Sequence, residues 1–428
     1  MEEPVYLLKL ELENVRCFGE KETLDLSDGN GNWRKWTVIL GDNGTGKTTL
    51  LQSMAGYEKL NFLDLTGEEG LINSYIPHIF SKQKSLPYPN NSNPKEARLG
   101  LTFFENELNS HTLTTINGTI NSSDQSKNII QKAIVFGYGA NRRISNDSLR
   151  ESRSENSESL FNENAKLINA EEWLFQLDYV ASKESDIRAF ASNKRNQVKQ
   201  ILIDLLPEIE DIRFTTPTKG DLVSYVEFKT PFGWLSIHQL SLGYKTMVAW
   251  MVDLAARMFK RYPDSDNPLA EPAIVLVDEI DLHLHPKWQR KIFDYLSEKF
   301  PATQFIVTAH SPLIVQSAPK DANIVVLRKE GDHVVIDNDV ESVQDWRLDQ
   351  IISSDLFGID SPRGPETEKW LTERKGLLQK EKLNEDEKTK LSILNQRANN
   401  LPTADMPKDI EAMEVIRKAA EYLKRQKG

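Results

Sequence analysis

The sequence predicts an α/β fold, in which a mixed β-sheet with helices is interrupted by an inserted helical segment and followed by a helical C-terminal tail. Three features predict it. Short apolar runs at 36–41, 273–277 and 304–308 are typical of buried strands, and each leads into polar residues. A glycine-rich turn joins the first run to a helix. Apolar residues recur at helical spacing in 170–206 and in the last part of the chain.

Length, charge and cysteine content limit the functions open to the chain. Its 428 residues suffice for one large domain with insertions or for two domains. The apolar runs are too short to span a membrane and the acidic start, Met1 to Pro4, does not resemble a signal peptide, so we expect a cytoplasmic protein without membrane contact. A net charge of −11 argues against wholesale polyanion binding but leaves room for a local basic patch. The single cysteine, Cys17, excludes an intrachain disulfide.

The first of the apolar runs leads into a phosphate-binding pattern. Glycines in such a turn let consecutive N–H groups point at one phosphate, and the helix that follows adds its positive end. We expect Lys47 to reach the β- and γ-phosphates of a nucleotide and the Thr48 hydroxyl to hold Mg²⁺. The alternative, a turn that only caps a helix, would not explain why Lys47 and the two threonines follow the glycines. The pattern Gly-x-x-x-x-Gly-Lys-Thr is fitted by Gly41, Asp42, Asn43, Gly44, Thr45, Gly46, Lys47 and Thr48, with Thr49 next.

Further strands are expected on both sides of this loop. Alternating residues at 6–14 and 23–26 predict two strands before it. After it, a polar surface loop is expected at about 67–96. The segment Gly137 to Arg143 contains two arginines and either touches a nucleotide or forms a turn with solvated charges, and the sequence leaves both open. Strands are expected at 99–104, 112–120, 132–136, 212–214, 223–228 and 234–237.

A second polar turn, Leu240-Ser241-Leu242-Gly243, precedes a long helix. Ser241 is placed as the helix N-cap and Gly243 permits close backbone approach, so a hydroxyl, N–H groups and the helix dipole face outward. Such an end suits an anion, although any capped helix has the same features. Helices are expected over Thr246–Lys260 and Lys287–Phe300.

The two later apolar strands end in residues suited to nucleotide hydrolysis. Asp278, at the end of a buried strand, can hold Mg²⁺, and Glu279 beside it can accept a proton from an attacking water. Asp281 follows two residues later. The next strand ends near His310, which taken singly is more often a structural histidine. At the neighbouring strand end, it is placed to meet a γ-phosphate.

This ordered set resembles the ABC-type ATPase head that is shared by transporter nucleotide-binding domains and the SMC and RecF group. Three segments, 10–18, 136–142 and 283–289, further resemble RecF-like and OLD-like bacterial ATPases, many of which serve in phage defence. The resemblance covers residues 5 to about 330. It implies a P-loop head over 1–340 that contains the helical insert 145–206, and a helical C-terminal extension over 341–428.

The resemblance also implies ATP and Mg²⁺ as cofactors and a role for each motif. Because Ser241 and Gly243 of such a head approach ATP held by another subunit, it implies a homodimer or a higher assembly. A clear glutamine loop is missing between Thr49 and Ser241, and the segment 137–142 is the candidate for its place. The implied roles are phosphate and Mg²⁺ binding by Lys47 and Thr48, Mg²⁺ binding by Asp278, the general base at Glu279, a D-loop position at Asp281, the switch histidine at His310, and an arginine near the nucleotide at Arg16.

The C-terminal part decides between functions. OLD-like proteins carry a nuclease after the head, but Asp337-Asn-Asp339 matches only one of its elements, at a spacing that chance provides, so no nuclease is expected here. The segment 350–358 resembles ATPase subunits of Septu-type and retron-linked defence systems, whose partner is a separate HNH nuclease. We therefore expect a dimeric ATP switch in anti-phage defence. The alternative is a RecF- or SMC-like ATPase of DNA repair, which binds DNA or RNA, and the neighbouring reading frame would discriminate between them.

Overall fold

The computed structural model describes residues 3–56 and 96–401, with short gaps at 107–108, 117–118, 122–128, 130–131, 146, 150–155, 207, 216–218, 220–223, 341–342, 344, 360–361 and 381. The chain forms two compact units, Met1–Phe357 and Gly358–Gly428. The first unit contains the sheets and the candidate site. Nearly all of the expected surface loop at 67–96 lies outside the described residues, as does the part of the expected helical extension that follows residue 401.

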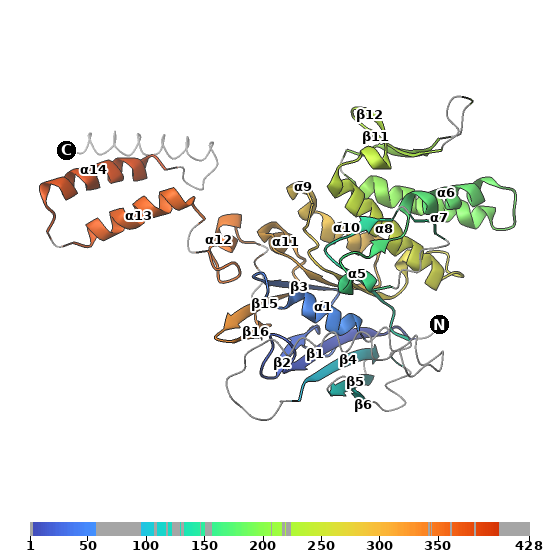
Figure 1. Cartoon of the computed structure of the whole chain (residues 1–428), viewed down its shortest axis with the longest axis horizontal. Coiled ribbons are helices and arrows are strands. Elements are labelled where there is room, and N and C mark those ends of the chain that lie inside the picture. The colour runs from blue at the N-terminus through green and yellow to red at the C-terminus, as the bar shows by residue number, and fades with distance from the viewer. Residues whose placement is uncertain are drawn as a thin grey trace, which may run out of the picture. The chain divides into compact units, whose positions relative to one another are not determined.

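A six-stranded sheet lies at the centre of the first unit, in the order β16–β15–β3–β14–β13–β7. Figure 1 labels its strands β3, β15 and β16. Its strands run parallel except for β16, which pairs antiparallel with β15 at one edge. Parallel strands end at the same edge of a sheet, so the residues that follow β3, β14, β13 and β7 meet there. The strands are β3 (Trp36–Gly41), β7 (Val135–Tyr138), β13 (Ala273–Val277), β14 (Thr303–Thr308), β15 (Asn323–Glu330) and β16 (His333–Asp337).

Both faces of this sheet are buried, which explains its unbroken apolar runs. In β3, Val38 and Leu40 belong to one hydrophobic cluster and Ile39 to the other. Val275 and Ile274 of β13 divide in the same way. The alternation follows from the two-residue period of a strand, because successive side chains point to opposite faces.

One face packs against α1 (Lys47–Ala55) and a second, antiparallel sheet in the order β2–β1–β4–β5–β6. The other face packs against a helical layer in which α8 is the longest element (Figure 1). The strands of the second sheet are β1 (Tyr6–Glu13), β2 (Glu22–Asp25), β4 (Arg98–Asn106), β5 (Asn109–Ile116) and β6 (Thr119–Asn121). The helices are α6 (Ala170–Ser182), α7 (Arg188–Leu205), α8 (Leu242–Arg261), α9 (Pro286–Gln289), α10 (Ile292–Lys299) and α11 (Pro312–Ser317).

Smaller elements complete the first unit, and a helix pair makes up the described part of the second. The smaller elements of the first unit are β8 (Arg143–Ile144), α5 (Glu158–Phe161), β9 (Lys166–Leu167), the sheet of β10 (Asp211–Phe214), β11 (Val226–Thr230) and β12 (Gly233–Ser236), the 3₁₀ turns η2 (Ile237–Gln239) and η3 (Pro268–Ala270), and α12 (Leu348–Ile352). The helix pair of the second unit is α13 (Pro365–Leu378) and α14 (Glu385–Asn399).

The expected fold class is confirmed: a mixed sheet with helices, inserted helices and a helical tail. Several expected bounds are wrong. The strand expected at 112–120 is the hairpin of β5 and β6, and the strand expected at 132–136 begins at Val135. The helix expected from Thr246 begins four residues earlier, at Leu242. The helix expected over 287–300 is broken into α9 and α10, since the Lys291 N–H bonds the Trp288 carbonyl in a tighter turn.

Within the part of the chain that the structure describes, no helix is both long and apolar enough to cross a membrane.

Candidate functional site

The loop between β3 and α1 has the backbone that its glycines predict. Gly44 and Gly46 have φ of 81° and 92°, in the left-handed region that glycine adopts without strain. Gly41 has φ of 148°, and a Cβ there would lie 2.7 Å from Thr45 Oγ1 and 2.9 Å from the Leu327 carbonyl oxygen. Asn43 is exposed in the loop. Replacement of these glycines would therefore change the shape of the turn.

Lys47 lies within this turn and is only 6% exposed. Its ammonium donates to the carbonyl oxygens of Gly41 at 2.8 Å and Asp42 at 2.9 Å. Burial lowers the pKa of Lys47, and the nearby carboxylates of Asp278 and Glu279 oppose that shift. The loop thus holds a fixed positive charge beside the carboxylates that end β13.

Asp278 lies between two threonine hydroxyls. Thr48 donates to Asp278 Oδ2 at 2.7 Å, and Thr308 donates to Asp278 Oδ1 at 2.6 Å. No cluster of three or more His, Cys, Asp or Glu residues suited to a metal is present among the described residues. The paired hydroxyl and carboxylate oxygens fit Mg²⁺, which takes one or two protein oxygens and completes its shell with water and phosphate oxygens.

Glu279 follows with a backbone that side chains rarely adopt. Its φ is 50°, a left-handed conformation that costs of order 1–3 kcal/mol in a residue other than glycine. The Glu279 N–H donates to Thr308 Oγ1 at 2.7 Å. Thr308 thereby contacts both carboxylate residues, through the side chain of Asp278 and the main chain of Glu279.

Asp281 connects the ends of β13 and β14. The N–H of His310 donates to Asp281 Oδ2 at 3.0 Å, and the His310 side chain is exposed. Oδ1 of Asp281 is buried and has no hydrogen-bond partner. Gln289 adds a second connection here, because its side chain donates to the Leu284 carbonyl at 3.1 Å and accepts from the Ser311 hydroxyl at 2.6 Å.

Ser241 is the N-cap of α8, and Gly243 in the first turn of the helix lies close to His283 in the segment that follows Asp281. Ser241 is the N-cap residue, is exposed, and its hydroxyl caps no N–H of the helix. A Cβ on Gly243 would lie 2.6 Å from the His283 carbonyl oxygen. The close approach that this glycine permits is therefore made within the chain.

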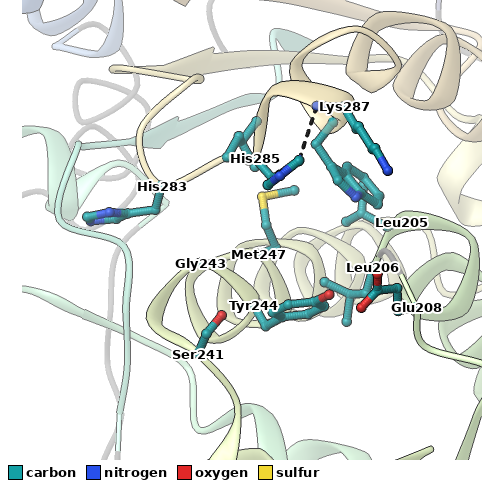
Figure 2. A pocket seen from close by; sticks show the side chains of 12 residues that line it. Leu205, Leu206, Glu208, Ser241, Gly243, Tyr244, Met247, His283, His285 and Lys287 are labelled. Atoms are coloured by element: carbon teal, nitrogen blue, oxygen red, sulfur yellow. Dashed lines mark hydrogen bonds between the residues drawn. The ribbon is translucent and has the colours of Figure 1, made fainter. Parts of the chain in front are cut away.

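A cavity of about 300 Å³ adjoins this turn. Figure 2 shows Ser241 and Gly243 at the start of α8, and both line the cavity together with His283 and His285. The cavity is lined by both apolar and polar side chains. The apolar ones include Leu205, Leu206, Met247, Leu284 and Trp288, and the polar ones include Glu208, Tyr244 and Lys287.

Arg16 is directed at α1. Its guanidinium donates to Thr49 Oγ1 at 3.0 Å and to Gln52 Oε1 at 2.8 Å. Thr49 is buried, and its hydroxyl accepts from this arginine. Cys17, the next residue, packs on the loop: a Cβ on Gly46 would lie 2.5 Å from Cys17 Sγ.

The structure thus brings together Lys47, Thr48, Asp278 and Glu279, and it locates Ser241 and Gly243 beside His283. Two residues in this site were missed by sequence reasoning. Thr308 was treated only as part of an apolar strand. Arg142 lay in a loop whose role was left open, and the sequence gave no signal of which of its two adjacent arginines, Arg142 or Arg143, turns inward.

Comparisons with known proteins indicate which family the chain belongs to. A family model described as "AAA domain, putative AbiEii toxin, Type IV TA system" matches residues 36–316, and a second, "AAA domain", matches 9–56. Solved structures of similar fold include "SMC head domain from Thermotoga maritima", 15% identical, covering 80% of this chain and 100% of that one at a TM-score of 0.42. The "SmcHead bound to the C-winged helix domain of ScpA" is 17% identical and covers 78% and 97% at a TM-score of 0.45.

Curated relatives extend the comparison. "Septu protein PtuA" of Bacillus mycoides is 24% identical over 83% of this chain and 45% of its own length, and its namesake in Bacillus thuringiensis is 23% identical over 77% and 80%. "Retron Ec83 probable ATPase" of Escherichia coli is 39% identical over 37% of this chain and 28% of its own. The chain thus spans less than half the length of the Bacillus mycoides PtuA and of the Ec83 ATPase. The expected relation to Septu and retron ATPases is confirmed. Since the first family model covers most of the chain and the phosphate-loop residues lie within it, the chain belongs to this family of AAA-domain ATPases.

Proposed function

We propose that the chain is a homodimeric, Mg²⁺-dependent ATP switch that acts in anti-phage defence and controls a separate HNH nuclease. The observation that carries the proposal is the meeting of Lys47, Thr48, Asp278 and Glu279 at the ends of β3 and β13. A cytoplasmic location stays a prediction from the sequence.

Each residue then has a defined task. The loop N–H groups and Lys47 bind and orient the phosphates of ATP. Thr48 and Asp278 hold Mg²⁺, which when bound neutralises charge on the phosphate oxygens. Glu279 accepts the proton of the attacking water, and the Thr308 hydroxyl holds the Glu279 main chain in place for it. His310, whose N–H is held by Asp281, orients toward the γ-phosphate.

The dimer is supported by the place of the second turn. One chain has a single phosphate loop and a single Leu-Ser-x-Gly turn that begins a long helix. Ser241 is exposed, its hydroxyl caps no helix N–H, and the turn packs on His283 within the chain. An exposed hydroxyl at the positive end of a helix suits a phosphate that is brought by a second subunit.

The cellular role is supported by the names of the relatives. Proteins called Septu PtuA match 83% and 77% of this chain, and a retron probable ATPase matches 37% of it. Residues 350–358, which carry the sequence resemblance to such ATPases, begin within α12 and run to the boundary of the first compact unit at Phe357. A separate partner is consistent with the lack of a nuclease motif in the sequence.

Purification from the native host, followed by native mass spectrometry, tests the proposal. The expected species contains two 48.9 kDa chains and a small nuclease. Recovery of the dimer with DNA and repair proteins, and without a nuclease, would favour the repair alternative. A protein that stays monomeric with ATP and Mg²⁺ would contradict the dimer.

A further inference from the structure

Arg142 is a buried cation that none of the expected roles uses. It is 3% exposed and lies in the segment between β7 and β8. Burial lowers its pKa to about 10, so the guanidinium is charged at neutral pH. A buried charge of this kind needs polar partners to offset the loss of water.

Those partners are main-chain carbonyls of the turn after β13. Arg142 Nη1 donates to the Asp278 carbonyl oxygen at 2.6 Å, and Nη2 donates to the Glu279 carbonyl oxygen at 2.9 Å. Nη1 also donates to the Gly139 carbonyl oxygen at 3.1 Å. The guanidinium therefore contacts two successive residues of the turn that bears the proposed magnesium ligand and base.

We infer that Arg142 is a positioning residue, which holds the Glu279 carboxylate in its reacting orientation by fixing the carbonyl oxygens of Asp278 and Glu279. The inference rests on the proposed function of Glu279. Glu279 has φ of 50°, a conformation that persists only where neighbouring groups enforce it. Thr308 holds its N–H at 2.7 Å, and Arg142 holds its carbonyl oxygen.

The surroundings keep the guanidinium in this orientation. Its carbon lies 5.6 Å from the centroid of the Trp250 ring in α8, within the range of a cation–π contact. Tyr138, at the end of β7, donates from its hydroxyl to Asp253 of α8 at 3.0 Å. The loop that carries Arg142 is thus attached to the same helix that begins with Ser241 and Gly243.

Lysine cannot replace this arrangement. A guanidinium presents several N–H groups in a fixed plane and so reaches both carbonyls at once, whereas an ammonium is a single point charge on a flexible stem. Arg142→Lys should lower kcat about 10- to 100-fold, since a small misplacement of a reacting group has an effect of this size. The KM for ATP should stay unchanged, because Lys47 and the loop N–H groups are untouched.

The experiment compares parent, Arg142→Lys, Glu279→Gln and the double variant in the full chain, with Arg143→Lys as the matched control because Arg143 is the exposed neighbour. The expected result is a loss of kcat in Arg142→Lys, none in Arg143→Lys, and no further loss when Arg142→Lys is added to Glu279→Gln.

Two results would overturn the inference: an unchanged kcat in Arg142→Lys, or an equal loss in the Glu279→Gln background. If Glu279→Gln alone keeps full activity, the proposed base is wrong, and that failure is seen separately. Should Arg142→Lys fail to fold, Thr308→Val removes the acceptor of the Glu279 N–H from the other side of the turn, and the same selective loss of kcat is expected. Loss of ATP affinity in that variant, with kcat kept, would equally overturn the inference.

Discussion

At the scale of single residues, the site is held through the main chain as much as through side chains. Asp278 donates its N–H to the Tyr138 carbonyl oxygen at 2.8 Å and accepts from Thr48 and Thr308 at its two carboxylate oxygens. Its carbonyl oxygen accepts from Arg142. An acid with every polar group engaged has little freedom to leave the end of its strand, so β13 presents a preorganised carboxylate.

Lys47→Ala should weaken ATP binding. The variant removes the fixed cation of the loop, and hydrogen bonds to charged groups contribute about 1.5–3 kcal/mol, so the affinity should fall by at least about tenfold. Isothermal titration with ATP and Mg²⁺ measures it. Lys329→Ala, which changes an exposed lysine on β15, is the control and should bind as the parent does. Undiminished affinity in Lys47→Ala would show that the loop is not the phosphate site.

Glu279→Gln should bind ATP but hydrolyse it slowly. The amide keeps the shape of the side chain but cannot accept the proton, and loss of a general base costs about 10²- to 10⁴-fold in kcat. Light scattering with ATP should then show a longer-lived dimer than the parent forms. Glu330→Gln, an exposed change, should leave both measurements unaltered. A Glu279→Gln protein that stays monomeric at all protein concentrations would count against a site shared between subunits.

At the scale of elements, sequence predicted the parts that are apolar on both faces. A strand buried in a parallel sheet must be apolar throughout, so β3, β13 and β14 and the polar residues after them were visible. Thr308 and Arg142 were not, because their partners are 30 and 136 residues away and are set by strand order. Nothing local in the sequence specifies that β7 lies beside β13.

The contact between α8 and the turn after β13 was also hidden from the sequence. Gly243 is needed there because a Cβ would lie 2.6 Å from the His283 carbonyl oxygen, and backbone cannot yield as a flexible side chain does. His283 itself has φ of 65°. The start of the helix and the turn therefore fix each other, and a shift in one displaces the other.

Gly243→Ala should push the start of α8 away from the turn that contains His283. The added methyl overpacks the contact, so the free energy of unfolding should fall by about 1–3 kcal/mol and hydrolysis should slow. Gly376→Ala is the matched control: it lies inside α13, nothing lies within 4 Å of its added Cβ, and alanine should stabilise the helix by about 0.5–1 kcal/mol. Denaturant unfolding measures both changes: the free energy of unfolding should fall in Gly243→Ala and rise in Gly376→Ala. A Gly243→Ala protein as stable and active as the parent would show that the contact has room to relax.

At the scale of the whole molecule, the question is whether one chain can hydrolyse ATP by itself. The phosphate loop, Asp278 and Glu279 meet at one edge of the central sheet, whereas Ser241 lies exposed at the start of α8. A second subunit related by two-fold symmetry would contribute its Ser241 to this chain's nucleotide and receive the same in return. Two complete sites then exist in a dimer and none in a monomer.

Ser241→Arg should block hydrolysis by placing bulk and charge in the proposed dimer seam, while ATP binding by the single chain should survive because Lys47 and Thr48 are unchanged. Ser241→Thr, which keeps a hydroxyl, is the control and should retain activity.

Mixing Ser241→Arg with Lys47→Ala tests the shared site directly. In a mixed dimer, one site contains both changes and the other contains neither, so a steady-state ATPase assay should recover part of the activity that each variant lacks alone. At equal amounts with random exchange, about half of the dimers are mixed, and each has one intact site out of two, so about a quarter of the parental activity is expected. Exchange is verified by native mass spectrometry of chains that differ in tag. If exchange occurs and the mixture remains inactive, Ser241 acts within its own chain or only begins a helix, and the two subunits do not share their sites.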